Sequence, residues 1–202
     1  MVYGATVSRR RFLARPAIDS SPLVSGQNVF TVGFQGRVAM LALDTGQVWW
    51  QHDASSYRGI ALDDDALYVA GADGSVVALR RRTGAEIWRQ KALAHRGLSA
   101  VALTDNAVVT ADYQGNVHWL DKATGELAAR TQSGKVRISN PPVVSGNMVI
   151  VVNDAGRISA FRTAPIGSTM AKPHGVPAES PSTPSGAAPE PAPSPTVTPQ
   201  PQ

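Results

Sequence analysis

A repeat of about 40 residues constrains the fold of this chain more than any single residue does. Three segments align on a leading glycine and a later Thr-Gly pair, and a fourth segment begins in the same way and then stops. The leading glycines are Gly36, Gly74, Gly115 and Gly156, so successive repeats lie 38, 41 and 41 residues apart. A period of this length, with several short strands in each unit, is typical of a β-propeller, in which each repeat forms one blade.

Within each repeat the sequence reads as four short strands, because apolar residues alternate or run continuously between turn residues. The strands expected in the first repeat are residues 22–25, 28–34, 37–43 and 47–52. The later repeats span about 59–92, 98–132 and 141–162, and the last of them has three strands. We therefore predict an all-β fold: a partial β-propeller of about four four-stranded antiparallel blades, half of an eight-bladed wheel, with the last blade incomplete.

Glycine and tryptophan recur at fixed places in the blades. A Thr-Gly pair separates the third strand from the fourth, where glycine can take the positive φ that a tight turn requires. A tryptophan follows on the fourth, outermost strand, where its large ring can pack against the neighbouring blade. The residues of this structural blade motif are Gly46, Trp49, Gly84, Trp88 and Gly125. The third blade has Ala128 at the tryptophan position, so we expect it to lack this contact.

The chain divides into three parts by composition. Residues 1–18 form an atypical basic leader with little strand pattern, which we expect to be unstructured, and residues 19–163 carry the blades. Residues 164–202 are rich in Pro, Ser and Ala and hold 11 of the 15 prolines, so they cannot bury enough apolar surface to offset the entropy of ordering. We predict a disordered tail, for which three roles are open: a spacer, a ligand for a proline-reading domain, or a dispensable extension.

Composition excludes several functional classes. The formal charge is +4, and the basic runs at 9–11 and 80–82 lack the aromatic or helical readers of a nucleic-acid-binding face. No stretch approaches the roughly 20 apolar residues of a membrane-spanning helix. The chain has no cysteine and therefore no disulfide, catalytic thiol or lipid-attachment site. We expect neither a nucleic-acid partner nor a direct membrane span.

The pattern Leu-Asp-x-x-Thr-Gly-x-x-x-Trp resembles the PQQ-type propeller repeat, which occurs in quinoprotein dehydrogenases and in the BamB family of outer-membrane assembly factors. The order of elements is similar to the second half of BamB. The segment from Asp19 to Phe30 resembles the opening of the family's fifth blade, and the segment from Pro142 to Arg162 resembles the place where BamB proteins end. The resemblance covers about residues 19–163, and three Thr-Gly pairs in register make it specific.

This resemblance implies a non-enzymatic scaffold of the outer-membrane β-barrel assembly (BAM) machinery, at the periplasmic face of the outer membrane. Its partners would be the POTRA domains of BamA, other BAM subunits and nascent outer-membrane β-barrel proteins, and it would need no cofactor or metal. Asp19 and the adjacent Ile18 match the family segment that meets the POTRA domains, which implies a partner contact. Asp19 could instead cap a strand, and Ile18 could belong to the core.

The sequence also departs from the family pattern. Ala17 stands where the family commonly has a further aspartate, and the residues before it do not resemble the family. BamB proteins have eight blades, a lipoprotein signal and an acylated cysteine. This chain has about four blades, and we expect neither a signal peptide nor a lipobox cysteine, so the sequence as written does not predict export.

A different function, as a fragment of a PQQ-dependent dehydrogenase, requires aspartates that hold calcium beside the quinone. The candidate ligands are Asp63, Asp64, Asp65, Asp73, Asp112 and Asp154. These aspartates fall at or near strand turns, where carboxylates more often bind the backbone, and the four histidines show no metal-ligand spacing. We therefore predict no catalysis.

A third function is that of a stand-alone protein-interaction module. An open half-wheel leaves an apolar blade face in water, and a second copy of the chain could cover it. Such a dimer would complete the wheel.

Overall fold

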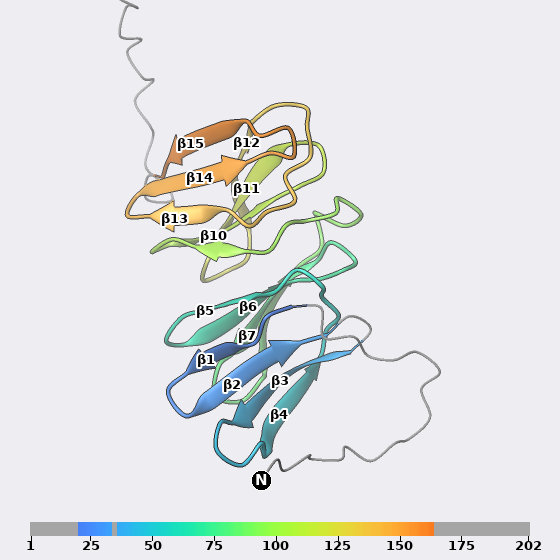
Figure 1. The fold of residues 1–202 in the computed structure, drawn as a ribbon, viewed down its shortest axis with the longest axis vertical. Coiled ribbons are helices and arrows are strands. Elements are labelled where there is room, and N and C mark those ends of the chain that lie inside the picture. Colours follow the sequence, from blue (N-terminus) through green and yellow to red (C-terminus); the bar gives the residue numbers. More distant parts are fainter. Residues whose placement is uncertain (1–19, 34–35, 164–202) are drawn as a thin grey trace, which may run out of the picture. The chain divides into compact units, whose positions relative to one another are not determined.

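The computed structural model describes residues 20–33 and 36–163, and within these ranges it contains strands and no helix (Figure 1). The first sheet consists of β1 (Leu23–Ser25), β2 (Asn28–Val32), β3 (Arg37–Ala42) and β4 (Val48–Asp53). The second consists of β5 (Ile60–Leu62), β6 (Ala66–Ala70), β7 (Val76–Arg80) and β8 (Glu86–Gln90). The third consists of β9 (Ala102–Leu103), β10 (Ala107–Ala111), β11 (Asn116–Asp121) and β12 (Leu127–Gln132). The fourth consists of β13 (Val143–Ser145), β14 (Met148–Val152) and β15 (Ile158–Arg162).

Each sheet is an antiparallel meander, because strands that follow one another along the chain pair with one another. Four such sheets are the blades of a β-propeller, so the predicted fold class is confirmed. The fourth sheet has three strands, as predicted. The predicted basic leader 1–18 and Pro-rich tail 164–202 lie outside the described residues. No helix in the described ranges could cross a membrane.

The Thr-Gly turns have the predicted backbone conformation. Gly46, Gly84 and Gly125 adopt φ values of +69°, +70° and +76°. In each turn the glycine N–H donates to the carbonyl four residues earlier, at 2.8–3.0 Å. A register shift in the third strand accompanies every turn, for example between Met40 and Leu41. The turn and the shift together set which face of the fourth strand points toward the next blade.

The core lies between successive blades. Along β6, Leu67 and Val69 pack with residues of the first blade, whereas Ala66, Tyr68 and Ala70 pack with residues of the third. This division follows from the alternation of side chains along a strand. A third cluster joins β10 and β11 to β14. Each middle blade is therefore buried on both faces.

The first inter-blade contact is made by Trp50, which corrects the prediction for Trp49. Trp50 is 8% exposed, whereas Trp49 on the opposite face of β4 is 54% exposed. The Trp50 indole N–H donates to the carbonyl of Arg81 in the second blade at 3.0 Å. In the second blade the tryptophan, Trp88, follows Gly84 by four residues. The same spacing from Gly46 selects Trp50, so the prediction of Trp49 was wrong by one residue although the sequence contained the correct spacing.

Gly84, in the Thr-Gly turn of the second blade, packs directly against the Trp50 ring. A Cβ atom on Gly84 would lie 2.7 Å from Cδ2 of Trp50, closer than carbon atoms can approach. The contact repeats one blade later, where Trp88 donates to the carbonyl of Lys122 at 3.0 Å and a Cβ on Gly125 would lie 2.5 Å from its Cδ2. The same contact therefore recurs in two successive blades, which explains why both the ring and the glycine recur in the motif.

The third blade makes its contact from a different strand. Ala129 of β12, not Ala128, occupies the tryptophan position, since it pairs with Trp119 as Trp50 pairs with Met40. Trp119 of β11, the pairing partner of Ala129, supplies an aromatic ring instead. It packs edge-on against Phe161 of the fourth blade, with ring centroids 5.7 Å apart. The expected loss of an aromatic contact is therefore compensated by a ring on the adjacent strand.

A glycine comparison tests the ring contact. Gly84 and Gly46 share the same positive φ, so an alanine suffers the same backbone strain at either position, but no atom lies within 4 Å of a Cβ on Gly46. We expect Gly84→Ala to lower the free energy of unfolding by about 1–3 kcal/mol more than Gly46→Ala does, because only Gly84 forces the Trp50 ring to move. Urea denaturation of both variants measures the difference. Equal losses would show that the ring contact does not depend on glycine.

Candidate functional site

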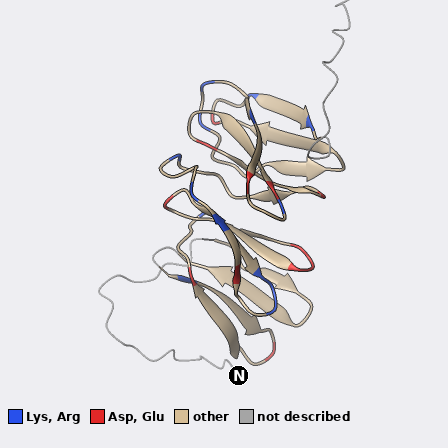
Figure 2. Cartoon of the chain, turned by 180° about the vertical axis from the view of Figure 1, so that it is seen from behind, with Lys and Arg blue, Asp and Glu red and all other residues tan. Residues whose placement is uncertain are grey.

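In the described part of the chain, Lys and Arg residues and Asp and Glu residues are interspersed along the ribbon (Figure 2). Most of them are exposed or half-buried. Among the described residues, Asp112 and His118 are the fully buried side chains that can carry a charge. Burying a charge is costly unless it is paired and hydrogen-bonded, so this pair marks the site that needs an explanation.

Asp112 organises the turn between β10 and β11. Its Oδ1 accepts the backbone N–H groups of Gln114 and Asn116, each at 2.9 Å. Its Oδ2 accepts from the Asn116 amide at 3.0 Å, from His118 Nε2 at 3.0 Å and from the Arg96 guanidinium at 3.2 Å. Asn116 and His118 reach the same carboxylate because residues two apart on a strand share a face.

These bonds decide the charge of the carboxyl group. Burial by itself raises the pKa of Asp112, but the hydrogen bonds from the His118 and Asn116 side chains and from the Asn116 backbone hold the pKa far below its ordinary value of 3.8. Asp112 is therefore ionised at neutral pH. An ionised carboxylate only accepts hydrogen bonds, so the Nε2 atom of His118 is the donor in their contact.

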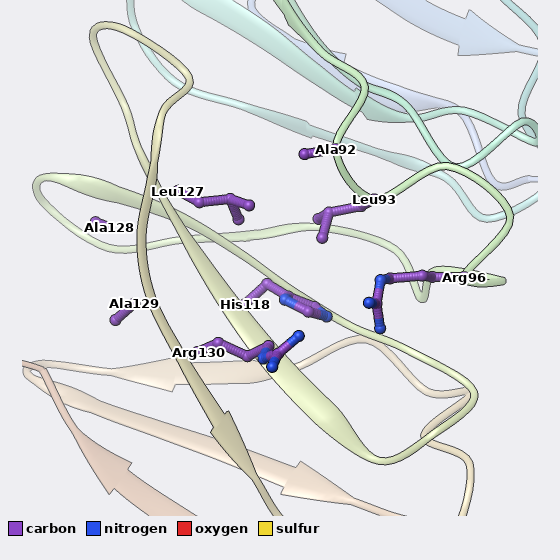
Figure 3. Close-up of a pocket in the computed structure, with 8 residues that line it drawn as sticks. All are labelled: Ala92, Leu93, Arg96, His118, Leu127, Ala128, Ala129 and Arg130. Atoms are coloured by element: carbon purple, nitrogen blue, oxygen red, sulfur yellow. The ribbon is translucent and has the colours of Figure 1, made fainter.

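The second ring nitrogen of His118 has no such partner. Nδ1 is buried and makes no hydrogen bond within the described part of the chain. His118 lines a cavity of about 260 Å³ between the connection from β8 to β9 and the strands β11 and β12. Figure 3 shows Arg96, His118 and Arg130 grouped at one end of this cavity, with Leu93 and Leu127 at the other. The cavity thus has a basic end and an apolar end.

A related cavity of about 280 Å³ lies one blade earlier, beside β6, β7 and β8. Its arginine is Arg89, which pairs with Val77 as Arg130 pairs with His118. Arg89 is neutralised by Glu86, whose Oε2 lies 2.6 Å from its terminal nitrogen. The two cavities are successive copies of one feature of the repeat, with different side chains.

The aspartates considered as calcium ligands bind the backbone and neighbouring side chains. Asp63 Oδ1 accepts the N–H of Ala66 at 2.7 Å, and its Oδ2 pairs with Lys122 of the third blade at 2.8 Å. Asp73 Oδ1 accepts the N–H and the hydroxyl of Ser75. In the ranges that the structure describes, no three His, Asp or Glu side chains are placed to hold a metal ion together.

Asp154 differs from the role expected for it. Asp73 and Asp112 bind their own turns, but Asp154 accepts hydrogen bonds from the N–H and hydroxyl of Ser139, at 3.1 and 2.6 Å. In the fourth blade the place of Asp112 is taken by Asn153, whose Oδ1 accepts the N–H groups of Ala155 and Arg157. The recurrence of aspartates in the sequence therefore does not reflect one structural position.

The predicted partner contacts Asp19 and Ile18 lie outside the described residues. Ser20, which follows them, donates its hydroxyl to the carbonyl of Val32 at 3.1 Å. Its Cβ lies 4.0 Å from the place of a Cβ on Gly59, just before β5. The chain therefore enters the first blade beside the connection that enters the second.

Comparison with known proteins identifies the family. The family model for outer membrane protein assembly factor BamB matches residues 10–90 and 72–165 of this chain. The chain belongs to the BamB family. The BamB of Pseudomonas aeruginosa is 36% identical over 144 residues, which are 71% of this chain and 38% of that protein. The BamB of Legionella pneumophila is 36% identical over 143 residues, 70% of this chain and 37% of that protein.

Solved structures agree with this assignment. The crystal structure of BamB from Moraxella catarrhalis is 25% identical with a TM-score of 0.67, over 72% of this chain and 44% of that one. The computationally designed Ika4 protein shares the fold, with a TM-score of 0.65 and 19% identity over 75% of this chain and 94% of the designed one. The chain spans less than two fifths of the length of the Pseudomonas aeruginosa and Legionella pneumophila BamB sequences.

The buried carboxylate makes stability depend on pH. Since the pKa of Asp112 is lower in the folded chain than its ordinary value of 3.8, the ionised group stabilises the fold above about pH 4, and this contribution is lost as the pH falls further. We expect Asp112→Asn to lower the free energy of unfolding by about 2–3 kcal/mol at pH 7 and by progressively less below pH 4.

Denaturant unfolding from pH 7 to pH 2 measures this difference. The control is Asp44→Asn, because Asp44 is exposed in the first Thr-Gly turn and its replacement should change stability by less than about 0.5 kcal/mol. A constant gap between Asp112→Asn and the unmodified chain at all pH values would contradict the assignment.

Proposed function

We propose that this chain acts as a non-enzymatic scaffold in the assembly of outer-membrane β-barrel proteins, at the periplasmic face of the outer membrane. Family membership across both halves of the described blades carries the proposal, since the relatives are named outer membrane protein assembly factors. Its partners are the POTRA domains of BamA, other BAM subunits and nascent β-barrel proteins. A propeller suits this role because rigid strands hold many loops in fixed positions for recognition.

The proposed BamA contact lies where the chain enters the first blade, at Asp19 and Ile18. Ser20, which follows Asp19, donates its hydroxyl to the carbonyl of Val32 as Ser56 donates to that of Ala70 in the second blade, so the described chain next to the proposed contact is bonded to the first blade.

Binding to isolated BamA POTRA domains tests the contact. We expect Asp19→Asn to weaken binding about tenfold, because a carboxylate that faces a basic group on the partner loses its charge while its shape is retained. The control is Glu126→Gln, which removes an exposed charge from the Thr-Gly turn of the third blade. Surface plasmon resonance at two salt concentrations gives both affinities. Equal affinities for the two variants would rule out Asp19 as the contact.

A stand-alone module that pairs with a second copy is the other candidate. It is favoured by the exposed apolar residues of the outer blades, among them Trp49 at 54%, Val24 at 60% and Ile158 at 69%. Gly46 also keeps the turn geometry that receives a tryptophan ring in later blades, yet no atom of the described chain lies within 4 Å of its Cβ position. A second copy would cover these surfaces.

Light scattering decides this candidate. Pairing predicts a mass of twice the 21.2 kDa chain, which falls to one chain in Trp49→Glu because a charge cannot be buried unpaired in an apolar interface. A folded chain that stays at 21.2 kDa at all concentrations would eliminate the dimer.

A further inference from the structure

The two inter-blade cavities differ in how their arginines are neutralised. In the second blade, Arg89 bonds Glu86 through two nitrogens, at 2.6 and 3.1 Å. The pairing partner of Leu79 is Glu86, and the pairing partner of the equivalent Leu120 is Leu127. The third blade therefore has an apolar side chain where the second has the counter-ion of its arginine.

Arg130 is consequently an arginine without a neutralising partner. Its side chain is exposed, and no hydrogen bond or ion pair of the described residues involves its guanidinium. Arg96, at the same end of the cavity, donates hydrogen bonds to the Asp112 carboxylate and to the Gln114 side chain. With one buried carboxylate against two guanidinium groups, the basic end of the cavity carries an uncompensated positive charge.

The same end of the cavity has an unsatisfied buried nitrogen. The His118 side chain is 1% exposed, its Nε2 is held by Asp112, and its Nδ1 has no partner among the described residues. A buried polar atom without a hydrogen bond costs free energy, which a ligand that reaches it would recover. A carboxylate that accepts from a protonated Nδ1 would do so, and its own negative charge would offset that of Arg130 and the imidazolium.

The walls of the cavity indicate how the carboxylate is presented. Leu93 and Leu127 form the apolar end, which suits aliphatic neighbours of an acidic side chain (Figure 3). β12 is the edge strand of its sheet, so its outer backbone groups are available to pair with an extended segment. Leu127, Ala128, Ala129 and Arg130 all belong to this strand and line the cavity.

We propose that this cavity binds the carboxylate of an Asp or Glu side chain, presented between apolar residues by an extended segment of a partner polypeptide. Arg130 is the principal contact, His118 Nδ1 the second, and the edge of β12 aligns the segment. The site is distinct from the BamA contact proposed at Asp19 and does not depend on it.

A capped pentapeptide with a central Glu between two Leu residues is a direct probe. Titrated into the full chain and followed by ¹H–¹⁵N NMR, it should shift resonances of β12, the Arg130 side chain and His118 Nδ1. The same peptide with Gln in place of Glu should bind about tenfold more weakly, because charge-assisted hydrogen bonds to a guanidinium are stronger than neutral ones. Equal affinity of the two peptides would overturn the proposal.

Three variants locate the binding. Arg130→Gln should weaken the Glu peptide about tenfold, and Leu127→Glu should weaken it at least as much, because it restores the internal counter-ion that the second blade has. Both positions are exposed, so the fold should survive. The matched control is Arg89→Gln, at the equivalent position of the second blade, which should leave binding unchanged within twofold. Retained binding in both Arg130→Gln and Leu127→Glu would refute the site.

A free carboxylate distinguishes the source of the ligand. Acetate lacks both the aliphatic neighbours and the backbone that the cavity and β12 accommodate, so at the peptide's saturating concentration it should produce no shift of the Arg130 resonance. An equal response to acetate would overturn the assignment to a polypeptide.

Discussion

The contact between a tryptophan ring and the glycine of the next blade is the constraint on which the arrangement of the blades depends. Trp50 against Gly84 and Trp88 against Gly125 repeat the same geometry, with the indole N–H bonded to a carbonyl of the following blade. The ring fixes the distance between two sheets, and the missing Cβ lets the turn reach it. Because a flat ring and a bare backbone leave no room for another atom, the contact also fixes the register of the fourth strand.

The cavity that we propose as a binding site arises where a blade departs from this repeat. In the third blade, the fourth strand has Ala129 where the first two blades have a tryptophan. The third strand, β11, has Trp119 opposite this alanine. In the same blade His118 replaces the apolar Val77, and Leu127 replaces the acidic Glu86. These exchanges leave the fold intact, since the backbone pairing is unchanged. They convert a neutralised surface arginine into one that lies free beside a cavity.

Much of the fold could be predicted from the sequence because its signals are local. Strand alternation, the Thr-Gly turns and the three-stranded fourth blade all follow from residues close together in the chain. The Trp49 prediction was wrong by one residue, because adjacent tryptophans on a strand face opposite sides and only the register shift near Met40 selects Trp50. The sequence placed Asp112 at a turn between two strands. Its contact with Arg96 could not be predicted, because Arg96 belongs to a separate connection.

The sequence by itself determined the family, the all-β class and the number of blades, because a repeat of fixed period can bury its apolar faces only by stacking copies of one unit. The tertiary structure alone decided which rings and charges meet. Trp119 faces Phe161, Lys122 pairs with Asp63, and His118 keeps one nitrogen unsatisfied through contacts between residues far apart in the chain. Such contacts depend on how neighbouring sheets face each other, a distance and an angle that no local pattern of residues encodes.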